Sequence, residues 1–404
     1  MLIQYKVGNY KSIKDDIIIK FTANRENNYS KWVNKSEDLS YNLFKVIGLV
    51  GPNASGKSNI LDSLSFAIRF IKRTIQRNES TEINVEPFLL DENSIDENTF
   101  FEFIFIEDNV KYVYGFEINK KTVDEEYLLA YYSKKPTTVF ERTKGNKFDF
   151  KGNDIKLQTD ISLKTNSNRL YLPVAAEWGY SKVASAYKWF NKMPEQYELK
   201  PQIIIDNMIQ SNKKNLIIDA LRKADINISD IYTKSKRMEK EQLDLINNFL
   251  RKLIKDYEPD IPEETPEIYI THNNKNGMDY SIPLDDDSSG TIEIIKSIAK
   301  IFYVNEKGGI IVEDELGKHY HTKLTQHIIN FIDNESFNNI QVLFASHDTK
   351  ILNILYPEQI YLVDKDDEGA TFVKLLDDYC IREKDNIELG YLKGRYGAIP
   401  YTKD

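Results

Sequence analysis

The chain of 404 residues has little cysteine, no long apolar run and no excess of positive charge, and each shortage excludes a class of protein. Its single cysteine, Cys380, rules out a disulfide framework within one chain and fits a reducing compartment. No apolar run approaches the ~18 residues that a membrane-spanning helix needs, and the start has no apolar segment typical of a secretory signal. We therefore expect a soluble, cytoplasmic protein with no membrane partner.

Positive charge is scarce because 54 lysines and arginines are set against 63 aspartates and glutamates, which gives a formal net charge of −9. This balance argues against a broadly basic coat for nucleic acid, although it leaves a local basic groove open. Apolar residues make up 41 % of the chain, which is enough for a sizeable core. The length allows two to three domains, and we expect one main domain with an inserted lobe.

The order of apolar patterns predicts an α/β protein. Residues 1–23 and 100–142 alternate apolar and polar side chains, as antiparallel strands do, whereas residues 181–257 show the spacing of amphipathic helices. Strand and helix patterns alternate in the C-terminal third, which indicates a parallel sheet. Residues 259–266 are rich in proline and acid and are typical of a linker. We divide the chain into an N-terminal part (1–180), a helical insertion (181–266) and a C-terminal part (267–404).

The most specific motif is Gly51-Pro52-Asn53-Ala54-Ser55-Gly56-Lys57-Ser58, which fits G-x-x-x-x-G-K-[ST] and stands between a strand pattern and a helix pattern. In such a loop, backbone N–H groups and the helix N-terminus face a phosphate, and Gly56 permits close approach. Lys57 is predicted to neutralise the phosphate oxygens, and Ser58 to hold Mg²⁺. The residues assigned to ATP binding here are Asn53, Ala54, Ser55, Gly56, Lys57, Ser58 and Asn59.

A second motif, Gly309-Ile310-Ile311-Val312-Glu313-Asp314-Glu315, delivers carboxylates at the end of a buried-strand pattern, where α/β sheets place their ligands. We predict that Asp314 orients the water shell of Mg²⁺ and that Glu315 is the general base for the attacking water. Glu313 stands where an apolar residue is expected. Strand alternation would point Glu313 and Glu315 the same way, so the role of base stays open between them.

Two further motifs are less specific alone. His347 follows the strand pattern at residues 340–345 and could hydrogen-bond a phosphate and the attacking water, although a lone histidine is more often structural. Its place one strand after the carboxylates favours a catalytic role. Ser288-Ser289-Gly290-Thr291 precedes a helix pattern, so it either caps that helix or contacts a phosphate.

With these four motifs in this order, the chain resembles the ABC-type ATPases related to the SMC and RecF repair proteins. More narrowly, it resembles the AAA-domain ATP-binding proteins of bacterial abortive-infection loci, the RloA and AbiL type. The segments that carry the narrower resemblance span most of the chain: Asn9–Ile13, Phe101–Phe103, Tyr112–Glu117, Phe140–Arg142, Ala224–Ile226 and Gly390–Pro400. Two positions depart from the group, Glu313 and the Tyr320-His321-Thr322 segment, which replaces Leu-His-Pro.

The resemblance implies a P-loop NTPase fold with an ABC-ATPase-like mixed sheet, a flanking antiparallel β lobe and an inserted helical lobe. It implies that Ser288–Thr291 faces the γ-phosphate held by a second subunit, so that ATP joins a homodimer or a higher assembly. It further implies a slow, regulated ATPase in anti-phage defence that controls an effector, a nuclease or toxin from a neighbouring gene. Two alternatives stay open: a RecF- or SMC-like DNA-binding repair ATPase, and a scaffold that holds ATP with little hydrolysis.

Two rival sites were weighed against this interpretation. His319, His321 and His327 are close in sequence, but no cysteine accompanies them and a metal site is not favoured. Asp364-Lys365-Asp366-Asp367 resembles the D-x-D motif of Toprim nucleases. Too little chain follows it for that domain, so we expect a polar turn, and we expect any nuclease activity to belong to a partner.

Overall fold

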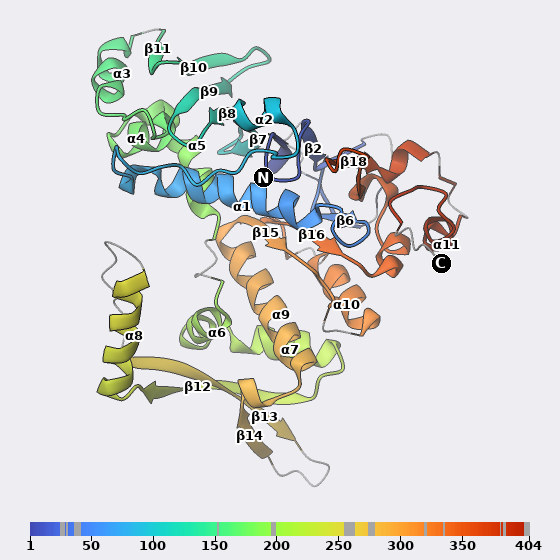
Figure 1. The fold of residues 1–404 in the computed structure, drawn as a ribbon. Helices are drawn as coiled ribbons and strands as arrows, with labels where there is room; N and C mark the ends of the chain where they lie inside the picture. The colour runs from blue at the N-terminus through green and yellow to red at the C-terminus, as the bar shows by residue number, and fades with distance from the viewer. Residues whose placement is uncertain are drawn as a thin grey trace. The chain divides into compact units, whose positions relative to one another are not determined.

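The computed structural model describes residues 1–24, 29, 31–35, 42–151, 153–194, 199–253, 263–273, 279–318, 321–333, 336–379, 381–382 and 385–399 (Figure 1). Contacts divide the chain into two compact units. The first comprises Met1–Pro194, Val304–Lys318 and Ile329–Asp404, and the second comprises Glu195–Tyr303 and His319–Ile328. Expectations about Cys380, His319, Tyr320, Pro400 and most of the 259–266 linker fall outside the described residues.

The first unit contains a five-stranded sheet. Its strands, in spatial order, are β15 (Gly309–Glu313), β16 (Ile340–Ser346), β6 (Val46–Val50), β17 (Ile360–Lys365) and β18 (Thr371–Leu375). The first four are parallel, and β18 pairs antiparallel with β17. Every residue of β6 and β16 is buried, as expected for strands covered on both faces. The C-terminal ends of β6, β15 and β16 therefore meet at one edge.

A seven-stranded antiparallel sheet forms the second layer of this unit. Its strands, in spatial order, are β11 (Lys147–Asp149), β10 (Thr137–Thr143), β9 (Val123–Tyr131), β8 (Val110–Ile118), β7 (Thr99–Glu107), β1 (Leu2–Gly8) and β2 (Ile17–Lys20). Burial alternates along β7, so Phe101, Phe103 and Phe105 face the core. Helix α1 (Lys57–Arg73) lies between the two sheets, and one apolar core joins all three (Figure 1).

Smaller elements complete the first unit. A three-stranded sheet has the order β3 (Thr22–Ala23), β5 (Asn42–Phe44), β4 (Val33–Lys35). The α-helices are α2 (Glu92–Asp96), α3 (Ile155–Ser162), α4 (Tyr171–Glu177), α5 (Ser181–Lys192) and α11 (Ile387–Leu392). The 3₁₀-helices are η1 (Thr74–Gln76), η3 (Thr349–Asn353), η4 (Pro357–Gln359) and η5 (Leu376–Tyr379).

The second unit mixes helices with a small antiparallel sheet. The sheet has the order β12 (Ile228–Arg237), β13 (Glu264–Asn273), β14 (Asp279–Pro283). Its helices are α6 (Pro201–Gln210), α7 (Lys214–Lys223), α8 (Lys240–Leu253) and η2 (Leu284–Asp286). Two further helices, α9 (Ser289–Lys307) and α10 (Thr322–Ile332), contribute residues to both units.

The α/β fold class is confirmed, with a mixed sheet and a flanking antiparallel sheet. The purely helical pattern predicted for residues 181–257 was wrong at β12, because Ile228 and Ile231 lie three apart and so fit a helix as well as a strand. Helix α5 belongs to the first unit rather than to an insertion. The division at residues 180 and 266 stays a prediction. Among the described residues, no helix combines the length and apolar character required to cross a bilayer.

Candidate nucleotide site

The loop at residues 51–56 links β6 to α1 at the edge where the parallel strands end. Ala54 and Gly56 adopt positive φ angles of 61° and 103°. A Cβ on Gly56 would lie 2.0 Å from Thr371 Oγ1, so only glycine fits there. The amides of Gly56, Lys57 and Ser58 donate to no acceptor in the described part of the chain. Three such donors at the start of a 17-residue helix form an anion-binding site.

Side chains from two distant segments hold the outer side of this loop. Thr371 Oγ1 on β18 donates to the carbonyl of Ser55 at 2.9 Å and lies 2.8 Å from Ser12 Oγ. Asn59 Nδ2 in turn donates to Ser12 Oγ at 2.6 Å. The sequence analysis gave neither Ser12 nor Thr371 a role. Ser12 lies in the Asn9–Ile13 segment noted for its resemblance, whereas no sequence signal marks Thr371.

Lys57 is buried at the first position of α1, with 4 % of the residue exposed. Its Nζ donates to the carbonyl oxygens of Gly51 at 2.8 Å and of Pro52 at 2.7 Å. Burial lowers the pKa of Lys57, and the carboxylates of Asp314 and Glu315 act in the opposite direction. The two carboxylates therefore lie within electrostatic reach of this ammonium.

The carboxylates lie just beyond the end of β15. The strand ends at Glu313, and Glu315 has a φ of +56° in the following turn. The expectation that Glu313 and Glu315 share a face was therefore wrong, because strand alternation does not continue past Glu313. Asp314 and Glu315 are the carboxylates whose charges act on both Lys57 and His347.

Lys318 forms an ion pair with Glu315 from the same turn. The turn is anchored to β16, because Leu316 N donates to the carbonyl of Ala345 at 2.9 Å and Ser346 Oγ donates to the carbonyl of Leu316 at 3.0 Å. The sequence analysis missed Lys318. A lysine three residues after a carboxylate is a common spacing and marks no particular site.

His347 follows β16 directly, and its side chain is largely exposed. The ring hydrogen-bonds the backbone of Gly51 in the loop. Partial burial and the Lys57 ammonium lower the pKa of His347, and Glu315 and Asp314 only partly oppose this shift. The imidazole is therefore neutral at pH 7 beside the ammonium and the two carboxylates. The ends of β6, β15 and β16 thus bring together Lys57, Asp314, Glu315 and His347.

The Ser288–Thr291 segment belongs to the second unit. Ser288 Oγ accepts a hydrogen bond from Thr291 N at 3.2 Å and lies 2.8 Å from Thr291 Oγ1. Ser288 therefore caps α9, which is the structural alternative considered from the sequence. Ser288 and Ser289 are both exposed, so the same cap remains accessible to a ligand or a partner.

The rival motifs have ordinary structural partners. Asp366 Oδ1 accepts from Glu368 N at 3.0 Å and Ala370 N at 2.8 Å, which closes the β17–β18 hairpin as the polar turn expected. His321 Nδ1 accepts from Lys323 N at 3.2 Å, and His327 hydrogen-bonds the backbone of Ala220. In the described part of the chain, no group of three or more His, Cys, Asp or Glu side chains could hold a metal ion.

The residues at the strand ends fit a magnesium nucleotide. The loop supplies unpaired amides and a buried ammonium for phosphate groups. The Ser58 hydroxyl and the Asp314 carboxylate are oxygen donors, the type that Mg²⁺ prefers, and both residues are exposed. Fold and site together define a P-loop nucleotide-binding protein.

A comparison with protein families agrees with this class. The model described as "AAA domain, putative AbiEii toxin, Type IV TA system" matches residues 46–353. The match covers more than half of the chain, so the chain belongs to this family. It supports the resemblance to defence-type AAA ATPases, while the narrower RloA or AbiL assignment stays a prediction.

Individual relatives are more distant. The chain is 22 % identical to the retron Vc95 probable ATPase of Vibrio cholerae serotype O1 biovar El Tor over 378 residues, which are 78 % of this chain and 68 % of that protein. Among solved structures it is similar to an SMC head bound to the C-terminal winged-helix domain of ScpA, with 12 % identity, a TM-score of 0.44 and coverage of 92 % and 96 %. It is also similar to the SMC head domain from Thermotoga maritima, with 13 % identity, a TM-score of 0.39 and coverage of 93 % and 98 %.

Proposed function

We propose that this protein is a Mg²⁺-dependent ATPase in which bound nucleotide gates a dimeric switch of anti-phage defence and so controls a partner effector. The observation that carries the proposal is the meeting of Lys57, Asp314, Glu315 and His347 beside the loop at residues 51–56. Membership of the AAA-domain family supports the ATPase activity. Similarity to a retron ATPase supports the defence setting.

Each side chain has a role that follows from its surroundings. The amides at the start of α1 bind phosphate oxygens, and the Lys57 ammonium exchanges its carbonyl partners for them. Ser58 and Asp314 hold Mg²⁺, which supplies charge neutralisation on the phosphates. Glu315 takes a proton from the attacking water, and the neutral ring of His347 orients that water.

The exposed start of α9 gives the proposed switch its second half. Ser288, Ser289, Gly290 and Thr291 offer hydroxyls and helix amides that can contact a γ-phosphate bound by another copy of the chain. Closure of the dimer would add these contacts, and hydrolysis would remove them. The nucleotide therefore shifts the population between open and closed dimers through its differential contacts.

The Glu315→Gln variant tests this proposal, because it keeps the shape of the side chain and removes its charge. We expect ATP binding to persist, phosphate release to fall by about 10²- to 10⁴-fold, and closed dimers to accumulate with ATP. Phosphate release and light scattering on a sizing column measure the two effects. Glu313→Gln is the matched control and should leave both unchanged. A Glu315→Gln protein that stays monomeric with ATP would refute the gating model.

The ion pair between Lys318 and Glu315 favours a second candidate, a scaffold that holds ATP with little hydrolysis. A carboxylate paired with an ammonium is a weaker base for water. In that case the wild-type protein and Glu315→Gln would dimerise with ATP equally and would release phosphate at the same negligible rate. A rate difference between them would exclude the scaffold.

A further inference from the structure

The C-terminal half of α1 carries a small basic pocket that the proposed ATPase does not use. Its volume is about 200 Å³. The residues that line it are Phe66, Arg69, Phe70, Arg73, Arg77 and Asn84, and none of these described side chains is acidic. The three arginines recur every fourth residue, so they follow one side of the helix and its extension. In a chain with a net charge of −9, this is a concentrated positive patch.

Ordinary helix electrostatics accounts for only part of this arrangement. Arg73 lies in the last turn of α1, where the helix dipole favours a cation. Arg69 lies in the body of the helix, and Arg77 follows the 3₁₀ turn η1. Like charges four residues apart repel each other. The spacing therefore weakens the helix unless an anion lies between the guanidinium groups.

The walls of the pocket are rigid. The rings of Phe66 and Phe70 are parallel within 5°, with centroids 6.1 Å apart, and the guanidinium of Arg77 lies 5.5 Å from the centre of the Phe70 ring. Arg77 Nη2 donates to the carbonyl of Thr81 at 3.1 Å, which fixes its position. Arg77 Nε is buried and has no hydrogen-bond acceptor among the described residues. The pocket thus combines a fixed guanidinium, an unsatisfied donor and an aromatic floor.

We propose that this pocket binds the phosphate backbone of a single nucleic-acid strand. Residues four apart on a helix are separated by about 6 Å along its axis, which is close to the spacing of successive phosphates in a strand. The guanidinium fork matches phosphate geometry. The volume lies below the roughly 300–1,000 Å³ of pockets for drug-sized ligands, so it admits a phosphate and its sugar but no base pair. Asn84 adds an amide for the sugar or base.

The Arg69→Gln/Arg73→Gln double variant tests the proposal. Both side chains are exposed, and glutamine is a good helix former, so the fold should persist. The measurement is fluorescence anisotropy of a labelled single-stranded DNA, and of an RNA of the same sequence, over a series of salt concentrations. We expect affinity to fall roughly tenfold for each arginine lost. The slope of log affinity against log salt should decrease by about 1.4, because each phosphate contact contributes about 0.7.

Arg222→Gln on α7 is the matched control, because this exposed arginine lies outside the pocket, and it should leave affinity and slope unchanged. The proposal would be overturned by a wild-type protein that binds neither strand, by an equal loss in the control, or by tighter binding of the duplex. Displacement of the strand by equimolar pyrophosphate would assign the pocket to a free phosphate ligand instead. Lys57→Ala should still bind the strand, which separates this proposal from failure of the proposed ATPase.

Discussion

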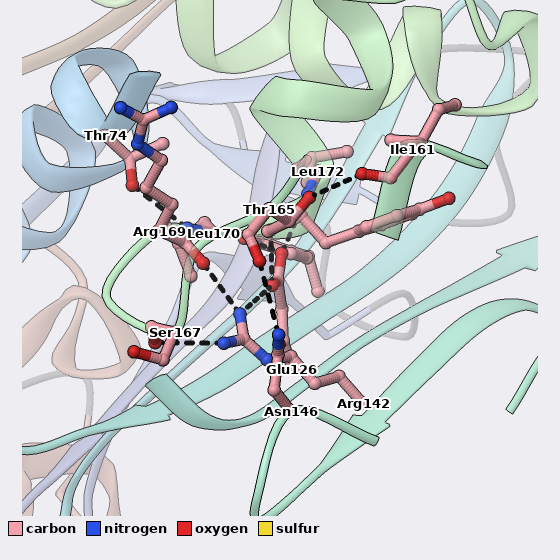
Figure 2. A network of polar contacts seen from close by, with 12 residues as sticks. Thr74, Glu126, Arg142, Asn146, Ile161, Thr165, Ser167, Arg169, Leu170 and Leu172 are labelled. Carbon is pink, nitrogen blue, oxygen red and sulfur yellow. Dashed lines mark hydrogen bonds and ion pairs between the residues drawn. The ribbon is translucent and has the colours of Figure 1, made fainter. Parts of the chain in front are cut away.

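Two regions of the first unit bury charge in different ways. In the antiparallel sheet, the side chains of Glu126 and Arg142 are both 0 % exposed and form an ion pair at 3.7 Å (Figure 2). The Glu126 carboxylate accepts from the amides of Tyr171 and Leu172 at 2.6 and 2.9 Å. Arg142 donates to the carbonyl of Arg169 at 2.6 Å and to that of Ser167 at 2.9 Å. Every one of these partners is a fixed part of the protein.

At the strand ends the partners are of another kind. Lys57 is almost as buried, but its Nζ rests on two carbonyls of an exposed loop that a phosphate can replace. Its countercharges, Asp314 and Glu315, lie in a turn beside the exposed ring of His347. The comparison teaches that burial of a charge does not mark a site. A site is marked by a buried charge whose partners can be exchanged.

The largest expected effect belongs to Arg142→Met in the antiparallel sheet. Removing this cation leaves Glu126 buried without a countercharge, which should lower the free energy of unfolding by about 3–5 kcal/mol. Urea denaturation measures the loss. The Glu126→Leu/Arg142→Met double variant is the control and should recover much of it, since no charge remains buried. A loss below about 1 kcal/mol in the single variant would show that the ion pair is not the organising contact of this region.

The sequence could predict the strand-end site but not this ion pair. Lys57, Ser58 and the carboxylates were found because a local motif and the parallel-strand rule place them without knowledge of the rest of the fold. Arg142 pairs directly with Glu126 only in the observed register of β10 and β9, which contains an irregularity after Thr138. A shift of one residue would point Arg142 to the opposite face, and composition cannot fix that register.

The remaining misses have the same physical cause. Thr371 reaches the phosphate loop only because β18 folds back on β17, and its role depends on that hairpin. Lys318 meets Glu315 because the chain turns sharply after β15, with Glu315 at positive φ, a conformation that glutamate rarely adopts. Tertiary register and backbone turns thus decided the contacts that spacing along the chain could not show.

Lys57→Met is the counterpart of Arg142→Met at the exchangeable site. We expect ATP affinity to fall by at least about 100-fold, because two or more charge-assisted contacts to phosphate are lost. The free energy of unfolding should change little or rise, because a buried cation disappears and its carbonyl partners lie on an accessible loop. Calorimetric titration with ATP and urea denaturation measure the two quantities.

The control for Lys57→Met is Lys156→Met, at an exposed position of α3, which should alter neither quantity. The outcome that breaks the comparison is a loss of stability similar to that of Arg142→Met. In that case the ammonium of Lys57 would be a structural charge, and the distinction between fixed and exchangeable partners would not separate the two regions.

The smallest effect concerns the protonation of His347. Its pKa lies below the ordinary 6.5 because the ring is partly buried and faces the Lys57 ammonium. As pH falls through 6.5, the unfolded chain binds the proton first, so the wild-type protein loses stability relative to His347→Asn until the lower folded pKa is passed. Solvent screens this exposed ring, so the difference should stay well below about 1 kcal/mol. Urea denaturation at several pH values measures it.

An NMR titration of His347 makes the same point without unfolding the protein. Lys57→Met removes the second largest cause of the shift, so the pKa of His347 should move up toward 6.5, whereas Lys156→Met should leave it unchanged. The upward direction is specific, because a loss of the carboxylates instead would lower the pKa further. If Lys57→Met leaves the titration where it was, the ammonium and the imidazole are not neighbours. The strand ends would then not converge on one nucleotide.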